Sequence, residues 1–239
     1  MQKKLLLGGT FLSSLFMTSQ QKTECCGIVG IASTLPQSQS STALFNIEAS
    51  QCTIKKFLCD GIELLKNRGY DSAGIFTMPF GDLTNQKLVK YADDGSSNAS
   101  CINRVVEEVM SESGLASCGI AHTRWATCGE KVDRNAHPHF DAKGSIHIVH
   151  NGIISNHQEI RNKYLQDVTF SSETDTEVIA QFIGLRKSQG RSVLEAISEF
   201  EKVAGKGEQW GLVVVDKNHP DTIYTATNGS PLLIGFSKD

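Results

Sequence analysis

Residues 26–31 read CGIVGI, which places a thiol at the head of an apolar, glycine-punctuated run that is typical of a β-strand. Gly27 beside Cys26 would let a substrate approach the backbone closely, and a cysteine in such a position is a candidate nucleophile. Small buried cysteines are also common in protein cores, so the stretch alone fits a structural thiol as well. The partners that a reactive thiol needs must therefore come from elsewhere in the chain.

The composition is that of a globular protein that has no excess of positive charge. The 239 residues are 39% hydrophobic and 21% charged, with a net charge of −3, which is enough for a packed core. We therefore expect no nucleic-acid partner and no membrane partner, and a small molecule or a protein instead. The seven cysteines contain no C-x-x-C pair and no zinc-type spacing. This indicates free thiols in a reducing cytoplasm, with neither a metal nor a cofactor.

The first 25 residues form a separate feature. Lys3 and Lys4 precede a diluted apolar run at 5–17 that is similar to a signal peptide, but no A-x-A cleavage site follows. We expect residues 1–25 to be a leader or propeptide, or the product of a start placed upstream of a true start at Met17. A genuine signal peptide would instead make the chain a secreted cysteine hydrolase. No later stretch is long and apolar enough to span a bilayer.

Apolar periodicity predicts an α+β fold with helices layered on antiparallel sheets. Residues 33–51 are rich in Ser, Thr and Gln and indicate an exposed insertion. Thr174 and Glu177 have the spacing of a capping box, which would open a helix with its apolar face at 178–183. Other helices are expected at 54–67, 102–113, 156–166 and 192–203. Strands are expected at 75–76, 87–91, 118–122, 146–149, 210–216, 222–227 and 231–234.

Polar groups at strand ends and at a helix start could serve a thiol that attacks an amide. Asn151 and Gly152 offer a side-chain amide beside an unhindered N–H, which is a workable oxyanion hole, although Asn-Gly is also the commonest turn dipeptide. Arg124 could bind a carboxylate or form a strand-end salt bridge. Asp175 could bind an ammonium or only favour the helix dipole. Together with Cys26, these groups fit an amino acid with a side-chain amide, of which glutamine is the obvious one.

Histidine is the other route to an activated thiol. The candidates for a Cys/His pair are His122, His137, His139 and His150. Their spacing selects none of them.

Six motifs resemble the class II glutamine amidotransferase domain of the glutamine:fructose-6-phosphate amidotransferases. They are CGIVG (26–30), RGYDSAG (68–74), HTRWAT (122–127), NAHPH (135–139), HNGII (150–154) and SETDTE (172–177). The RWAT, NAHP and ETDTE forms favour this family over the purine-pathway amidotransferase and asparagine synthetase. The resemblance covers residues 26 to about 235. It implies a four-layer αββα N-terminal-nucleophile hydrolase fold over 26–239, incomplete at its C-terminal end, with the sugar-isomerase domains absent.

The resemblance also implies a role for each matching residue. Cys26 would be the nucleophile, and its own α-amine would be the base once nothing precedes it. Asn151 and Gly152 would form the oxyanion hole, Arg124 would hold the glutamine α-carboxylate and Asp175 its α-ammonium.

Four further residues are placed by the same resemblance. Trp125, Thr127 and His137 would line the pocket, and Arg68 would lie near the nucleophile's end of the chain. Cys128 stands where the family has histidine, which alters part of the pocket.

The implied activity is glutamine hydrolysis that supplies ammonia for glucosamine 6-phosphate formation from fructose 6-phosphate. The implied partners are glutamine and a sugar-isomerase domain or subunit, and a homo-oligomer is left open. Two alternatives remain. One is a non-catalytic glutamine-binding or partner-binding remnant, and the other is another class II amidotransferase such as the purine-pathway enzyme.

Overall fold

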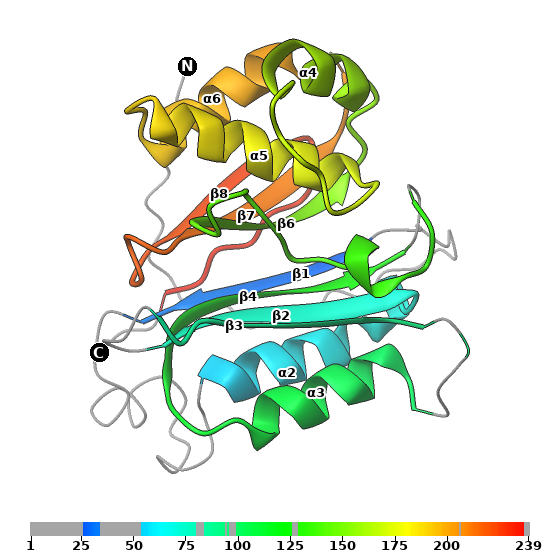
Figure 1. The fold of residues 1–239 in the computed structure, drawn as a ribbon. Coiled ribbons are helices and arrows are strands. Elements are labelled where there is room, and N and C mark those ends of the chain that lie inside the picture. Colours follow the sequence, from blue (N-terminus) through cyan, green and yellow to red (C-terminus); the bar gives the residue numbers. More distant parts are fainter. Residues whose placement is uncertain are drawn as a thin grey trace.

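The computed structural model describes residues 26–33, 54–79, 84–93, 95, 99–125, 129–205 and 207–236. Two four-stranded antiparallel sheets are stacked between two helical layers (Figure 1). The expected four-layer α+β arrangement is therefore confirmed. The leader at 1–25, nearly all of the insertion at 33–51, and the residues Thr127 and Cys128 lie outside the described residues.

The first sheet has the strand order β1-β4-β2-β3, and every neighbouring pair is antiparallel. Its strands are β1 (Gly27–Ala32), β2 (Ser72–Pro79), β3 (Lys87–Ala92) and β4 (Ala116–Arg124). Helices α2 (Ile54–Leu64) and α3 (Cys101–Ser111) cover its outer face, and α2 is followed by the 3-10 turn η1 (Lys66–Arg68). Apolar residues at helical spacing, such as Leu58 and Ile62, are fully buried against this sheet.

The second sheet has the order β5-β6-β7-β8 and is also antiparallel. Its strands are β5 (His139–Phe140), β6 (Ile146–Gly152), β7 (Trp210–Asp216) and β8 (Ile223–Asn228). Helices α4 (His157–Tyr164), α5 (Asp175–Ser188) and α6 (Val193–Val203) cover it on the side away from the first sheet. The 3-10 turn η2 (Asp133–Asn135) lies in the connection between the two sheets.

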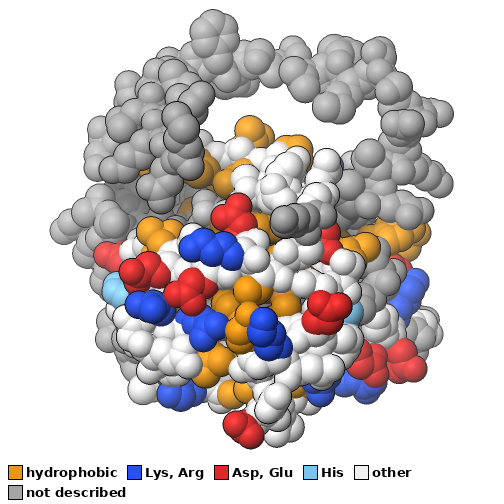
Figure 2. Space-filling view, turned by 90° about the horizontal axis from the view of Figure 1, so that it is seen from above, with side chains coloured by type: hydrophobic (Ala, Val, Ile, Leu, Met, Phe, Trp, Pro, Cys, Tyr) orange, Lys and Arg blue, Asp and Glu red, His pale blue; other side chains and the backbone are white. Residues whose placement is uncertain are grey.

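The outer surface of this second helical layer carries charges of both signs. Figure 2 shows acidic and basic side chains interspersed on this face rather than gathered by sign. Arg186 on α5 and Arg191 after it both pair with Glu199 on α6, at 2.9 and 3.0 Å. Charges of both signs on this face accord with a net charge of only −3 for the chain. Among the described residues, no helix is both long and apolar enough to cross a bilayer.

Strand alternation sets which residues face the gap between the two sheets. Ile120 on β4 and Val149 on β6 are fully buried in the apolar cluster between the sheets. Ile148, the neighbour of Val149, packs instead against the helices of the outer layer. Residues two and four positions beyond Ile120, and two beyond Val149, therefore face the other sheet.

Five expectations about local structure need correction. The strand expected at 75–76 begins at Ser72, so it takes in half of the RGYDSAG motif. The strand expected at 231–234 is not formed, and Leu233 in that segment is 97% exposed. An apolar run alone does not make a strand, because a strand also needs a partner for its backbone groups. The strands before the HTRWAT and HNGII motifs are also longer than expected and end at Arg124 and Gly152.

The fifth correction concerns the start of α5. Thr174 is the N-cap, and its hydroxyl accepts from the backbone N–H of Glu177 at 3.3 Å. The carboxylate of Glu177 does not return to Thr174, however. It accepts instead from the N–H groups of Ser171 and Ser172 at 2.9 and 2.6 Å. Only half of the expected capping box is formed, and the other half stabilises the turn that leads into the helix.

Candidate active site

Cys26 lies at the start of β1, directly before its first hydrogen-bonded residue. Gly27 pairs with Thr123 in the register of β1 and β4, so the next pair along would be Cys26 and Arg124. Ile28, two residues after Cys26, packs into the cluster between the sheets, and a side chain two positions earlier lies on the same face. The Cys26 thiol is half-buried, and its Sγ lies 3.9 Å from the main-chain oxygen of Trp125.

Three predicted substrate-binding residues surround this end of the first sheet. Arg124 ends β4 on the inner face and is 4% exposed. Trp125 follows it, half-buried, with its ring edge-on to Tyr70 at a centroid distance of 5.3 Å. Arg68 donates from Nε to the main-chain oxygen of Cys26 at 3.4 Å. The first group of candidate residues is therefore adjacent in space, although it comes from three separate segments.

A second group lies at the end of β6. Asn151 is two positions beyond the buried Val149, so it faces the first sheet. Gly152 has φ +145°, and an added Cβ there would come within 2.6 Å of the Gln209 oxygen. Glycine is thus required for both conformation and space at this position.

Asp175, the first residue of α5, is held against the same loop. Its Oδ2 accepts from the N–H of Ile154 at 2.8 Å and lies 3.9 Å from Nδ1 of His150. Asp175 is 6% exposed. These two contacts place the Asp175 carboxyl group near the end of β6, which carries Asn151 and Gly152.

A chain of buried histidines joins the two groups. His122 on β4 lies with Nε2 at 3.1 Å from the main-chain oxygen of His150 on β6, and His137 Nδ1 lies at 3.2 Å from the same His122 nitrogen. His150 Nδ1 contacts the Thr176 hydroxyl at 3.0 Å, and His139 Nε2 contacts that of Thr174 at 3.0 Å. These contacts tie β4, β6 and the start of α5 together.

Burial keeps these histidines neutral. Burial, together with the nearby Arg124 charge, lowers the pKa of His122 to about 3. Burial also lowers the pKa of His137 and His139 well below the usual value, with neighbouring positive groups adding to the effect. For His150, burial outweighs the raising influence of Asp175 on the pKa. Neutral imidazoles between the sheets add no charge to the site and serve as hydrogen-bonding spacers.

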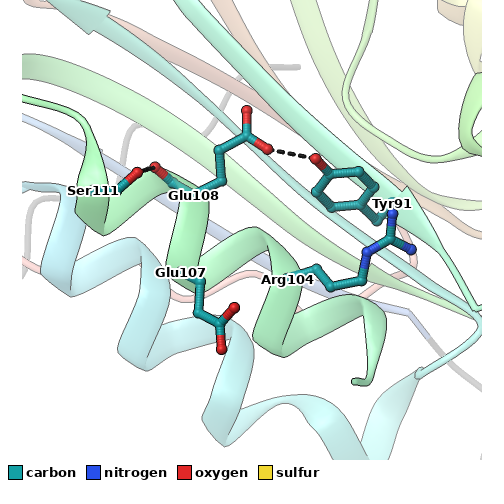
Figure 3. A pocket seen from close by; sticks show the side chains of 5 residues that line it. All are labelled: Tyr91, Arg104, Glu107, Glu108 and Ser111. Carbon is teal, nitrogen blue, oxygen red and sulfur yellow. Dashed lines mark hydrogen bonds between the residues drawn. The ribbon is translucent and has the colours of Figure 1, made fainter. Parts of the chain in front are cut away.

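One hollow of about 480 Å³ lies elsewhere, between β3 and α3 (Figure 3). Its lining groups bond to one another: the Tyr91 hydroxyl donates to the Glu108 carboxylate, and the Arg104 guanidinium lies 3.9 Å above the Tyr91 ring. The Tyr91 ring packs on the helical side of the first sheet, whereas the candidate residues face the second sheet. We therefore do not assign this hollow to the site.

Known proteins are similar to this chain in sequence and in fold. The profile of the glutamine amidotransferase domain family matches residues 107–199. In structure, the chain is similar to the B. subtilis glutamine phosphoribosylpyrophosphate amidotransferase complexed with ADP and GMP. The TM-score is 0.50 and the identity 20%, covering 81% of this chain and 35% of that one. The chain belongs to the glutamine amidotransferase family.

Within that family, its curated relatives are bacterial glutamine–fructose-6-phosphate aminotransferases of the isomerizing type. The protein from Lactiplantibacillus plantarum is 40% identical over 182 residues, which is 76% of this chain and 28% of that protein. The proteins from Staphylococcus epidermidis and Bacillus thuringiensis subsp. konkukian are 41% identical over 189 and 187 residues, in each case 77% of this chain and 29% of the relative. The chain thus spans less than a third of the length of these relatives.

Proposed function

We propose that this chain hydrolyses the side-chain amide of glutamine, with Cys26 as the nucleophile. The proposal rests on one observation: the candidate residues lie at the ends of strands in two different sheets, and these strands are in contact. Cys26 and Arg124 come from the first sheet, Asn151 and Gly152 from the second, and the His122 contact to the His150 oxygen joins β4, which carries Arg124 and pairs with β1, to β6, which carries Asn151 and Gly152. A thiol, a guanidinium and an amide that all lie on the inner faces of the two sheets suit an amino-acid amide better than a larger or uncharged substrate.

The reaction begins with transfer of the Cys26 thiol proton to a base and attack of the sulfur on the glutamine amide carbon. The Asn151 amide and the Gly152 N–H would stabilise the oxyanion. The C–N bond then breaks as the proton passes to the leaving nitrogen, which gives ammonia and a γ-glutamyl thioester. Water attacks the thioester, releases glutamate and restores the thiol.

The base in this proposal is the α-amine of Cys26 itself. A free α-amine has a pKa of about 8, so a useful fraction is unprotonated at neutral pH. An amine acylated by a preceding residue has no such lone pair. Activity therefore requires a chain in which Cys26 is the first residue.

Substrate contacts follow from the same positions. Arg124 would pair with the α-carboxylate and Asp175 with the α-ammonium of glutamine, while Trp125, Thr127 and His137 would line the pocket. Arg68, which donates to the Cys26 oxygen, would fix the end of the chain that carries the nucleophile.

The wider role rests on the relatives. We infer that the ammonia serves glucosamine 6-phosphate formation from fructose 6-phosphate, with sugar-isomerase domains or a separate isomerase polypeptide as partner. This chain would then be the glutaminase part of that enzyme, acting in the cytoplasm.

The test measures ammonia and glutamate release from glutamine by a chain that begins at Cys26, by the full chain and by Cys26→Ala in the shorter form. We expect turnover only from the first. Cys59→Ala is the matched thiol control, because Cys59 belongs to α2 and is buried against the outer face of the first sheet, away from the second sheet. Equal release by Cys26→Ala and the parent would refute the mechanism. Glutamine binding without turnover would identify a non-catalytic remnant instead.

A further inference from the structure

Lys90 on β3 is a half-buried cation that the proposed reaction does not use. Its neighbour Val89 packs against the helices of the first sheet, whereas Leu88 packs into the cluster between the sheets. Lys90 shares the face of Leu88, so its side chain runs toward the second sheet. Within the described part of the chain, no carboxylate lies within 4.0 Å of its ammonium.

The ammonium instead binds three main-chain oxygens of one loop. Nζ donates to Ala136 at 2.8 Å and lies 3.4 Å from both the Arg134 and the Pro138 oxygens. An ammonium has three N–H donors, and the three carbonyls, one from η2 and two from the segment that follows it, present three acceptors to it. Hydrogen bonds from a charged donor are stronger than neutral ones. Burial lowers the pKa of Lys90 to about 8, while Glu177 and Asp133 raise it.

The bound loop carries His137 between two of these carbonyls. His137 contacts His122, which in turn contacts the His150 oxygen next to Asn151. Gly74 on β2 makes the close approach of this loop possible, since an added Cβ there would overlap the His137 oxygen. The contacts of the His137 and His122 rings therefore connect this loop to β6, the strand that carries the predicted oxyanion-hole residues.

We propose that Lys90 is a positioning residue for the glutamine pocket. Its ammonium holds the loop 134–138 on the first sheet, and this fixes the His137 ring beside the candidate site. The inference deepens the proposed function and rests on it. Lys90 itself touches loop carbonyls and acts on the substrate only through His137.

The variants for the test are Lys90→Met, which keeps the length of the side chain without its donors, and Lys90→Arg, which keeps a charge and donors. Lys87→Met is the matched control: Lys87 lies on the same strand but faces α3, where it pairs with Glu112 at 2.7 Å. The first readout is the hydrogen–deuterium exchange of peptides that cover residues 131–140. We expect faster exchange in Lys90→Met only.

The second readout is kinetic, on chains that begin at Cys26. We expect Lys90→Met to raise the KM for glutamine about tenfold with kcat changed by less than about threefold, since roughly one charged hydrogen bond's worth of positioning is lost. Lys90→Arg should recover most of this loss, and Lys87→Met should match the parent. Recovery by arginine is not expected if Lys90 serves only as packing.

The outcomes separate the two hypotheses. Unchanged exchange in Lys90→Met would overturn the loop contact, and faster exchange with unchanged KM would overturn the link to the pocket. A parent chain without turnover would refute the proposed function. In that case, glutamine affinity measured by calorimetry replaces KM, and equal affinity of the parent and Lys90→Met would overturn the positioning role.

Discussion

The Nε2 atom of His122 lies 3.1 Å from the main-chain oxygen of His150, and this contact crosses from one sheet to the other. The His150 carbonyl belongs to the peptide that leads into Asn151. His122 itself is two residues before Arg124 on β4. One buried imidazole therefore sets the spacing between the residue predicted to bind the substrate carboxylate and the residues predicted to form the oxyanion hole.

Replacing His122 by phenylalanine should test this contact. The ring stays, but the His150 oxygen and His137 lose their partner, which should lower the free energy of unfolding by about 1–3 kcal/mol. The kcat for glutamine should fall as well. Urea unfolding and initial rates measure the two effects. His147→Phe is the matched control, because His147 is buried against Phe76 with ring centroids 3.6 Å apart. A His122→Phe chain as stable as His147→Phe would contradict the prediction.

The stability of the fold should fall in mild acid. Five buried histidines, namely His122, His137, His139, His147 and His150, have a lowered pKa in the folded state, mainly because of burial. Below the unfolded pKa of about 6.5, the unfolded chain binds protons that the folded chain does not, so stability drops as the pH falls. Each such histidine costs about 1.4 kcal/mol per pH unit in this window.

For His122 and His147, the lowered pKa extends the window down to about pH 3. The midpoint of urea unfolding, measured at pH 7.5, 6.5 and 5.5, should decrease from pH 6.5 to pH 5.5. In His147→Phe, the midpoint should decrease less over the same interval. A flat profile from pH 6.5 to 5.5 would show that these imidazoles are protonated in the folded chain.

Gly152→Ala should distort the end of β6, where the predicted oxyanion hole lies. The φ of +145° is one that alanine rarely adopts, and its Cβ would meet the Gln209 oxygen at 2.6 Å. Strain of this kind costs of order 1–3 kcal/mol, and we expect loss of most glutamine turnover. Gly211→Ala is the control on the paired strand, where the nearest atom lies 3.6 Å from an added Cβ. Full activity in Gly152→Ala would exclude the N–H of this residue from the oxyanion hole.

Asp175→Asn and Asp175→Ala should separate charge from loop support. Asparagine keeps an oxygen that can accept from Ile154, so the melting temperature should stay within about 2 °C while the KM for glutamine rises tenfold or more. Alanine also removes the 2.8 Å bond to Ile154, so stability and kcat should fall too. Kinetics and thermal unfolding of both variants check this. An unchanged KM in Asp175→Asn would remove Asp175 from ammonium binding.

Local sequence signals predicted the helices well and the limits of the strands less well. Apolar spacing placed a helix at 192–203, where α6 spans Val193–Val203, because that pattern depends only on neighbours along the chain. Ser72 and Gly74 read as a turn because they are small or polar. They form a strand because β4 and β3 pair with them on both sides. Pairing of this kind depends on residues that lie between 16 and 52 positions away in the sequence.

For the candidate site too, local sequence signals predicted some features and could not predict others. The motifs predicted a set of candidate residues, but no spacing rule selected among His122, His137, His139 and His150. Their contacts join residues on separate strands and a loop, and only the packing of the two sheets brings them together. Lys90 was missed for the same reason, since a lone lysine on a short strand reads as solvent-exposed. Its partners are main-chain oxygens, which leave no trace in side-chain chemistry.

Each sheet is built from a continuous half of the chain, with the first between Gly27 and Arg124 and the second between His139 and Asn228. The candidate residues are divided between these halves. Two separately produced fragments, divided near Glu130 in the connection between the sheets, would each keep one sheet with its helices and would reconstitute the pocket only by associating. Glutamine that binds only the assembled pocket would then stabilise the complex of the two fragments, and this stabilisation would increase with the affinity of the pocket for glutamine.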